Sequence, residues 1–274
     1  MPRVAFQGEL GAFSEEAIAA FWRNEATPVP MRHNRDVARA VADETVDLGM
    51  LPVENTLAGS VAPSYDALAE IPEIFVIGET VLAIHHCLLA PRGATLDRLV
   101  TVESHPVALD QCAGFLGLHS WIRAQASYDT AGAARDVARA GDPSRGAIAS
   151  RAAAARYGLA ILADGIQDRQ DNQTRFVAIS REAAPVSPGI PTRTMLVLMT
   201  PNLPGALAKV LNPFAEHGIN LTRIESRPTG EPWTYRFFLE LEHRGGSDAA
   251  ARSIEAVRAV TASLRVIGSY PLGV

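Results

Sequence analysis

The residues of this sequence that are best suited to bind a ligand lie in short polar runs. Arg175 follows Thr174, and its guanidinium fork suits a bidentate pair with a carboxylate better than a lysine would. Ser104 and His105 precede Pro106 at a predicted helix start, where unpaired backbone N–H groups favour an anion. Several such helix starts, brought together, would favour a ligand with more than one negative group. Taken singly, each is also an ordinary cap of the kind found in any α/β protein.

The elements that must position these runs alternate short apolar strands with helices. Strands are predicted at 4–6, 48–53, 76–89 (one long strand or two short ones), 99–102, 146–149 and 174–180. Helix N-caps are predicted at Ser14, at Asp129 or Thr130, and at Ser150. This alternation predicts an α/β fold with mostly parallel sheets, whose ligand-binding loops gather at the carboxyl ends of the strands.

A proline-rich stretch divides the chain. Residues 183–192 contain three prolines in ten positions, and proline cannot donate to a strand or helix ladder, so this stretch is a predicted linker. It separates a domain at 1–182 from a smaller domain at 193–274. The smaller domain has predicted strands and helices in the order βαββαβ, which is that of ferredoxin-like domains. Its uncovered sheet face and edges predict pairing with another chain, hence a dimer.

The composition excludes several classes of protein. The chain is 47% hydrophobic and 20% charged with a net charge of −5, and no long basic run stands out, so nucleic acid is not an expected partner. Cys87 and Cys112 each lie in an apolar segment and are predicted to be buried, reduced thiols. His85 and His86 suggest a metal pair, but adjacent strand residues face opposite sides, so a structural role is favoured.

No membrane or export segment is apparent. The start of the chain lacks the apolar stretch and cleavage site of a signal peptide. No apolar run approaches the roughly 18 residues that a membrane helix needs. We therefore expect a soluble cytoplasmic protein with no membrane partner.

Five motifs in order resemble the prephenate dehydratase family across nearly the whole chain. They are Gly8-Glu9-Leu10-Gly11-Ala12-Phe13-Ser14, Leu51-Pro52-Val53-Glu54-Asn55-Thr56, Ser104-His105-Pro106 with Gln111, Gly146-Ala147-Ile148-Ala149-Ser150, and Ile166-Gln167-Asp168 with Asn172-Gln173-Thr174-Arg175-Phe176. The smaller domain resembles an ACT domain through Pro204-Gly205-Ala206-Leu207 and Glu225-Ser226-Arg227-Pro228. Each motif alone is weak, but five in the right order with an ACT domain behind them are specific. Position 173 departs from the pattern, because it is Gln where many relatives carry Thr or Asn.

The resemblance implies a fold and an activity. The fold is α/β, with a two-lobed catalytic domain like a type II periplasmic binding protein and a ferredoxin-like ACT domain. The activity is conversion of prephenate to phenylpyruvate, carbon dioxide and water, with L-phenylalanine as allosteric effector of a homodimer or homotetramer. No metal and no organic cofactor are implied. Since no chorismate mutase segment precedes Met1, we expect a monofunctional enzyme.

Two alternatives to this activity remain. Arogenate dehydratase runs the same chemistry on an amino-acid analogue, and the sequence does not separate the two substrates. A non-catalytic amino-acid-sensing binding protein is the other alternative. Such a protein would be expected to lose the run Thr174-Arg175-Phe176, which is intact.

The resemblance also assigns functions to residues. The implied catalytic residues are Thr174, at the leaving hydroxyl, with Arg175 and Glu54. The implied substrate-binding residues are Ala12, Phe13, Ser14, Asn55, Thr56, Ser104, His105 and Phe176. The implied effector-binding residues are Asn202, Leu203, Gly205, Ala206, Leu207, Glu225 and Ser226. Structural alternatives stay open for several: on residue type alone Thr174 bonds locally, His105 caps its own helix, Phe176 packs in the core and Glu54 orients Asn55.

Strand alternation limits the site. If the strand begins at Thr174, then Arg175 points to the opposite face from Thr174 and Phe176. The two polar side chains would share one site only if the strand began after Arg175. A strong pair with the carboxylate that leaves would also stabilise the ground state and slow the reaction. We therefore expect Arg175 to act on the pyruvyl carboxylate or on the fold of the motif.

Overall fold

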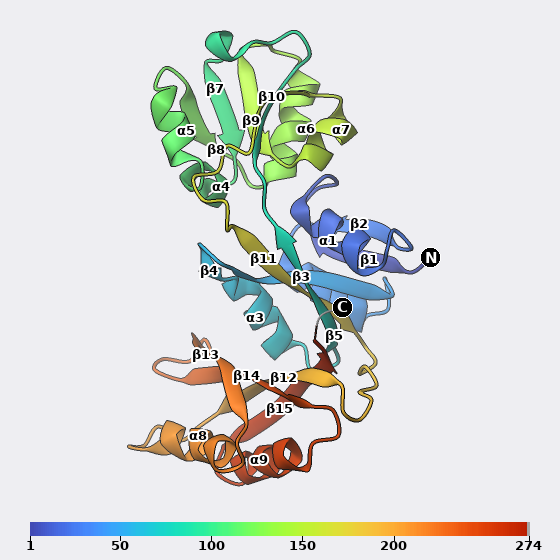
Figure 1. Ribbon diagram of the computed structural model, residues 1–274, viewed down its shortest axis with the longest axis vertical. Coiled ribbons are helices and arrows are strands. Elements are labelled where there is room, and N and C mark those ends of the chain that lie inside the picture. The colour runs from blue at the N-terminus through green and yellow to red at the C-terminus, as the bar shows by residue number, and fades with distance from the viewer. Residues whose placement is uncertain (273–274) are drawn as a thin grey trace. The chain divides into compact units, whose positions relative to one another are not determined.

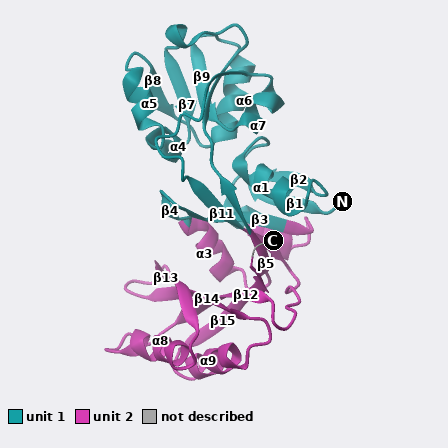
Figure 2. Ribbon diagram, in the orientation of Figure 1, with its two compact units in different colours: residues 1–37, 49–61, 80–176 teal, residues 38–48, 62–79, 177–274 magenta. Residues whose placement is uncertain are grey.

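The computed structural model describes residues 1–272 (Figure 1). These form two compact units (Figure 2). Unit 1 consists of Met1–Val37, Gly49–Val61 and Thr80–Phe176, and unit 2 of Ala38–Leu48, Ala62–Glu79 and the residues from Val177 onward. Unit 2 thus joins segments from both sides of the proline-rich stretch. The division of the chain into domains at 182 and 193 stays a prediction.

The first sheet contains the strands that carry Asn55 and Thr174. Its order is β2-β1-β3-β11-β5, with the short β4 paired to β3. The strands are β1 (Arg3–Gln7), β2 (Thr27–Met31), β3 (Leu48–Asn55), β4 (Gly59–Ser60), β5 (Phe75–Ala83) and β11 (Gln173–Ser180). The helices between them are α1 (Phe13–Phe21), α2 (Asn34–Ala42) and α3 (Ala62–Glu70). Because β3 and β11 are neighbours, residues far apart in the sequence meet at their ends.

The second sheet lies wholly in unit 1. Its order is β10-β6-β9-β7-β8, in which β7 runs parallel to β8 and β9 while β6 runs antiparallel to β9 and β10. The strands are β6 (Cys87–Ala90), β7 (Thr101–Ser104), β8 (Arg123–Ala126), β9 (Arg145–Ala149) and β10 (Ala160–Asp164). The helices are α4 (Pro106–Asp110), α5 (Ala113–Leu118), α6 (Thr130–Ala140) and α7 (Arg151–Tyr157), with a 3₁₀ turn at Leu96–Arg98. Figure 1 shows α4 and α5 on one side of this sheet and α6 and α7 on the other.

The apolar stretch at 76–89 forms two strands rather than one. β5 belongs to the first sheet and β6 to the second, and residues 84–86 connect them. Leu88 and Leu89 of β6 are fully buried, as is Val76 of β5. The break therefore falls at the polar pair His85-His86, where the chain passes from one sheet to the other.

The helix starts agree only in part with the predicted caps. Asp129 accepts a hydrogen bond from Gly132 N at 2.7 Å and Ser150 accepts one from Ala153 N at 3.0 Å, so both are N-caps as predicted. The prediction for Ser14 was wrong, because α1 begins at Phe13 and its N-cap is Ala12. The Ala12 N-cap has no side-chain cap bond, and the Glu15 carboxylate of the first turn accepts the Gly11 N–H just before the helix.

The third sheet has the βαββαβ order that the sequence predicts. Its elements are β12 (Pro191–Met199), α8 (Ala206–Glu216), β13 (Asn220–Pro228), β14 (Tyr235–Arg244), α9 (Asp248–Arg258) and β15 (Ser263–Pro271). The sheet order is β13-β14-β12-β15, and the helices pack on a buried core that includes Leu196, Phe214 and Leu239. The predicted fold class, an α/β protein with two lobes and a ferredoxin-like domain, is confirmed.

Unit 2 packs α3 and part of β5 against the third sheet. Tyr65 of α3 is fully buried, with its ring centroid 4.9 Å from that of Phe238. Glu79 of β5 is paired with Arg193 of β12 at 2.6 Å. No helix within residues 1–272 is both long enough and apolar enough to cross a membrane.

Candidate active site

Thr174 lies in a network of side-chain amides within unit 1. Asn55 Nδ2 donates to Thr174 Oγ1 at 2.9 Å and to Asn172 Oδ1 at 2.8 Å. Asn172 Nδ2 in turn donates to Gln111 Oε1 at 3.0 Å. Gln111 Nε2 lies 3.4 Å from Asn55 Oδ1, so Asn55, Asn172 and Gln111 form a closed ring, which we call the amide ring. Its members come from three segments that are far apart in the sequence.

The backbone fixes the direction of the amide ring. Asn55 Oδ1 accepts from two backbone N–H groups, Leu57 N at 3.0 Å and Ala58 N at 2.8 Å. An amide nitrogen in that position could not accept from them, so Nδ2 of Asn55 must be the atom that faces Thr174. Thr174 Oγ1 is therefore an acceptor toward Asn55. Its own O–H remains as a donor for another group.

The pair Glu54 and Arg175 lies on the other side of the same two strands. Arg175 donates to Glu54 Oε2 at 3.2 Å, and its side chain is 10% exposed against 41% for Glu54. β11 begins at Gln173, before Thr174, so alternation turns Arg175 away from Thr174 and Phe176. Of the two strand starts that the sequence left open, the structure has the one before Arg175. Arg175 and Thr174 do not share one face of the strand, and Arg175 already has a carboxylate partner.

Three other predicted site residues are hydrogen-bonded to backbone groups of the protein itself. Thr56 Oγ1 donates to Asp171 O at 2.9 Å and accepts from Gln173 N at 3.0 Å, so it holds the β3 and β11 segments together. Ser104 is buried and donates to Ile148 O at 2.6 Å. His105 is exposed and accepts from Val107 N at 3.3 Å, as the N-cap of α4. The alternative in which His105 caps its own helix agrees with this geometry.

The remaining predicted substrate residues are mostly buried. Ala12 and Ser14 lie at the start of α1 and are at most slightly exposed. Phe13 contacts the ring of His86 edge-on, with centroids 5.5 Å apart at 82°. Phe176 is 2% exposed, which agrees with packing in the core. Of these four, Phe13 is the one whose ring contact joins it to the residues around the amide ring.

A cavity of about 360 Å³ adjoins the amide ring. Its lining residues come from the loop after β3, from α4 and from the segment before β11, and they are Leu57, Ala58, Val107, Asp110, Gln111, Asp168 and Arg169. Gln111 is shared by the cavity and the ring. The volume falls in the range of pockets that hold small organic ligands. The geometry therefore gives a small substrate a place beside hydrogen-bonding amides.

The sequence predicted no site role for Gln111, Asn172 or Gln167, and it favoured a structural role for His86. Gln111 and Asn172 lie in the motifs that carry the family resemblance, which was the available signal. Gln167 Oε1 accepts from His86 N at 3.0 Å, and His86 Nε2 lies 2.9 Å from Gln111 Oε1. Within residues 1–272, no group of three or more His, Cys, Asp or Glu side chains is arranged to hold a metal ion.

The predicted effector residues lie at one end of the third sheet. Ser226 of β13 is paired with Phe237 of β14, which is paired with Leu198 of β12. The loop that follows β12 leads to Gly205, the N-cap of α8, at φ 78°. The register therefore brings the β13 residues Glu225 and Ser226 to the end of the sheet where this loop begins. Glu225 Oε2 also pairs with Arg223 at 3.1 Å.

Comparisons with known proteins bear on this site. A family model described as "Prephenate dehydratase" matches residues 4–184, and one described as "ACT domain" matches residues 194–259. "Arogenate dehydratase 2" of Petunia hybrida is 40% identical, with 98% of this chain and 71% of the relative covered. "Bifunctional chorismate mutase/prephenate dehydratase" of Enterobacter agglomerans is 31% identical, with 98% of this chain and 70% of the relative covered.

Two solved structures are similar over almost the whole chain. One is the prephenate dehydratase of Arthrobacter aurescens in complex with L-Phe, with a TM-score of 0.90, 30% identity, and 98% of this chain and 89% of that chain covered. The other is described as "GqqA- a novel type of quorum quenching acylases", with a TM-score of 0.89, 33% identity, and 99% of this chain and 98% of that chain covered.

Proposed function

Because the chain belongs to the prephenate dehydratase family, we propose that it removes carbon dioxide and water from prephenate and releases phenylpyruvate, a step of L-phenylalanine biosynthesis. The observation that carries this proposal is the bond from Asn55 Nδ2 to Thr174 Oγ1, which leaves the threonine O–H as a donor. A hydroxyl donor at this point suits a substrate from which hydroxide must depart.

The reaction balances without a cofactor. The bond between the ring carbon and its carboxylate breaks, and its electron pair enters the ring as carbon dioxide leaves. The ring electrons then expel the C4 hydroxyl, and the C4–O bond breaks with its electron pair on oxygen. The departing oxygen takes one proton and leaves as water. Thr174 donates a hydrogen bond to that oxygen or relays the proton, which is ultimately replaced from solvent. Aromatisation of the ring supplies much of the driving force.

The other predicted residues bind and shape the substrate. Asn55, which is itself contacted by Gln111, donates to the Thr174 hydroxyl oxygen and holds it in place, so little reorganisation is needed when the reaction occurs. Arg175, paired with Glu54, acts on the fold of the motif or on the pyruvyl carboxylate from the opposite strand face. Phe13 and the start of α1 close the site against water beside His86.

Arogenate is the second candidate substrate. The supporting observation is the 40% identity to a relative named arogenate dehydratase. Arogenate carries an ammonium group where prephenate has a keto group, and acidic side chains such as Asp110 and Asp168 line the adjoining cavity. The same loss of carbon dioxide and water from arogenate would give phenylalanine directly.

The decisive experiment offers the purified protein each substrate. Phenylpyruvate from prephenate and phenylalanine from arogenate are followed separately, and acylase activity is assayed in a third arm because of the structure described as an acylase. We expect turnover of at least one of the first two substrates. Absence of both dehydratase activities would overturn the proposal. If the protein hydrolysed only acyl substrates, it would be an acylase instead.

We propose further that L-phenylalanine binds the ACT domain and inhibits the enzyme. The support is the similar structure in complex with L-Phe and the sheet register that brings the loop residues and β13 to one end of the sheet. The ligand residues are the predicted ones: Asn202, Leu203, Gly205, Ala206, Leu207, Glu225 and Ser226. Replacing Leu207 or Ser226 should weaken inhibition and leave basal turnover unchanged. Inhibition that is unaltered in both variants would show that the effector binds at a different site.

Assembly and location are also proposals. The third sheet has two edge strands, β13 and β15, and a second copy pairing at such an edge supports a homodimer or homotetramer. Cys87 and Cys112 are both free and buried, which is typical of a reducing compartment and supports a cytoplasmic protein. Sedimentation analysis with and without L-phenylalanine would measure the assembly directly.

A further inference from the structure

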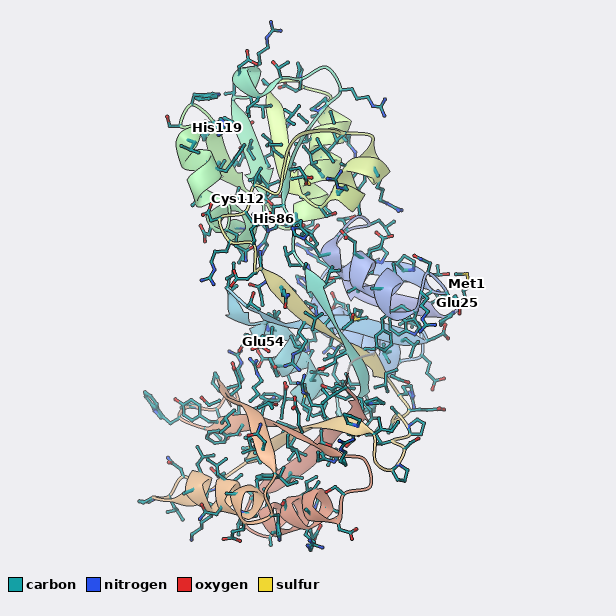
Figure 3. The ribbon with its side chains drawn as sticks, in the orientation of Figure 1. Met1, Glu25, Glu54, His86, Cys112 and His119 are labelled. Atoms are coloured by element: carbon teal, nitrogen blue, oxygen red, sulfur yellow. The ribbon has the colours of Figure 1, made fainter. Side chains whose placement is uncertain are left out.

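His86 lies beside the amide ring, where the chain passes from the first sheet to the second. Figure 3 labels it on the connection that leads from β5 into the second sheet. The side chain is 2% exposed, and its Nε2 lies 2.9 Å from Gln111 Oε1. Its backbone N–H donates to Gln167 and its carbonyl accepts from Ile166 N at 3.0 Å, so the residue is held at both backbone groups.

The amide ring determines which nitrogen of His86 carries the proton. Asn172 Nδ2 donates to Gln111 Oε1, so Oε1 is an acceptor and cannot donate to the imidazole. The 2.9 Å contact then requires a proton on His86 Nε2. The other nitrogen, Nδ1, is buried without a hydrogen-bond partner among the described residues. A second proton there would put an unbalanced charge into a buried site, so the imidazole is neutral.

We propose that His86 is a positioning residue that reinforces the direction the backbone sets for the amide ring. Its Nε2 proton holds Gln111, Gln111 contacts Asn55, and Asn55 holds the Thr174 hydroxyl oxygen. Gln111 receives hydrogen bonds from Asn172 and His86 on the same oxygen, which holds its amide group in one of two possible orientations. In the reversed orientation an NH₂ group would face both donors. The proposal rests on the function proposed above, because it concerns the same hydroxyl.

A purely structural role would have a different signature. His86 could simply fill space against Phe13, and its loss would then reduce stability and activity together, whatever stands at position 174. A positioning role acts through Thr174. It therefore affects kcat rather than KM, and it disappears when the hydroxyl is absent, which a double-mutant cycle measures.

The first test is that cycle, run with whichever substrate the wild-type enzyme converts. His86→Leu should lower kcat roughly 10- to 100-fold with KM little changed, as expected when a buried acceptor loses its donor. In the Thr174→Ala background the same change should lower kcat less than about twofold, because residues that act as a unit are not additive. His86→Gln, which restores a donor near the Nε2 position, should recover most of kcat. His119→Leu, at a histidine bonded to Phe115 O at 2.8 Å, is the matched control and should leave kcat unchanged.

The second test does not depend on activity or on His86→Leu folding. Nitrogen NMR of the wild-type protein near neutral pH should show one His86 nitrogen protonated, Nε2, and the other, Nδ1, bare. Protonation at Nδ1, or full additivity of the His86 and Thr174 changes, would overturn the proposal. Failure of the wild type to convert either substrate would instead count against the proposed function, and the NMR result would still decide the state of His86.

Discussion

The proposed function of Thr174 depends on whether its hydroxyl donates or accepts in the hydrogen bond with Asn55. The bond from Asn55 places the threonine oxygen in the acceptor role, and two backbone N–H groups on Asn55 Oδ1 prevent the amide from turning over. A threonine hydroxyl is too weak an acid to ionise near neutral pH, so its contribution is orientation and hydrogen bonding rather than a free proton. Removal of the hydroxyl therefore has a specific kinetic consequence.

Thr174→Ala should lower kcat by at least about 100-fold and change KM by less than about threefold, because the lost bond is made to the departing oxygen in the transition state. Thr174→Ser keeps the hydroxyl and is the control, with kcat within about tenfold of the wild type. Steady-state kinetics with prephenate and with arogenate provide the measurement. Near-normal turnover in Thr174→Ala would remove this residue from the mechanism.

The two thiols respond to pH in a predictable way. Burial raises the pKa of Cys87 to about 12, with a bond to Asp164 adding to the shift, and burial raises the pKa of Cys112 to about 12 as well. At pH 9 both should stay protonated in the folded protein and resist alkylation by iodoacetamide. The unfolded chain should react quickly. Rapid labelling of either thiol in the native protein would contradict their burial.

The same shifts bear on stability. Because the folded-state pKa lies above the ordinary value of 9.0, the stabilising contribution is fully present below pH 9. Between pH 9 and about 12 the unfolded chain loses these protons first, so the free energy of unfolding should fall as pH rises through that window. Denaturant titrations at a series of alkaline pH values would show the decline.

At the scale of elements, alternation along β3 and β11 separates two functions. Successive residues of both strands face opposite sides, so Asn55 meets Thr174 on one face and Glu54 meets Arg175 on the other. The sequence predicted, on the condition that the strand begins at Thr174, that Arg175 faces away from Thr174, because this follows from strand periodicity. It did not predict which β3 residue each side chain meets, nor the contact of Gln111 with Asn172, since these two lie 61 positions apart and no local pattern sets their contact.

In the glycine-rich loop before α1, Gly11 packs closely against the backbone of α7. Gly11 has φ +93°, and a Cβ at this position would lie 2.9 Å from Ala153 Cα of α7. Gly11→Ala should therefore destabilise the protein by about 2 kcal/mol or more, through both the backbone conformation and the contact. Gly158→Ala is the control: it has φ +69° with open space around it, so about 1 kcal/mol is expected. Equal effects in chemical denaturation would argue against the close approach.

At the scale of the whole molecule, a linear division of the chain describes only part of its packing. The proline-rich stretch, and the different order of predicted strands and helices after it, predicted the βαββαβ domain correctly. No pattern in the sequence indicated that α3 and the first half of β5 share a compact unit with that domain. The contacts that join them include the buried pair of Glu79 with Arg193 and the ring contact of Tyr65 with Phe238, which depend on tertiary arrangement and leave no periodic pattern in the sequence.

These pairs should make the stability of unit 2 sensitive to single charges. Arg193→Met leaves the buried Glu79 and its neighbour Glu242 without the guanidinium, and should lower the free energy of unfolding by about 3 kcal/mol or more. The matched control is Arg258→Met, which breaks a pair with Glu255 whose side chains are 49% and 78% exposed. That change should cost less than about 0.5 kcal/mol. Denaturant unfolding of the full chain would separate the two outcomes.

The amide ring has a consequence for how the enzyme responds to its medium. Asn55, Asn172 and Gln111 carry no formal charge, and neither does Thr174, so the dipoles that orient the hydroxyl act over short distances. Dissolved ions screen interactions between exposed charges over roughly 10 Å, and they have little effect on hydrogen bonds that are already in contact. The chemical step should therefore tolerate a wide range of ionic strength. Only the capture of an anionic substrate from solution, which depends on charged groups, should weaken as salt is added.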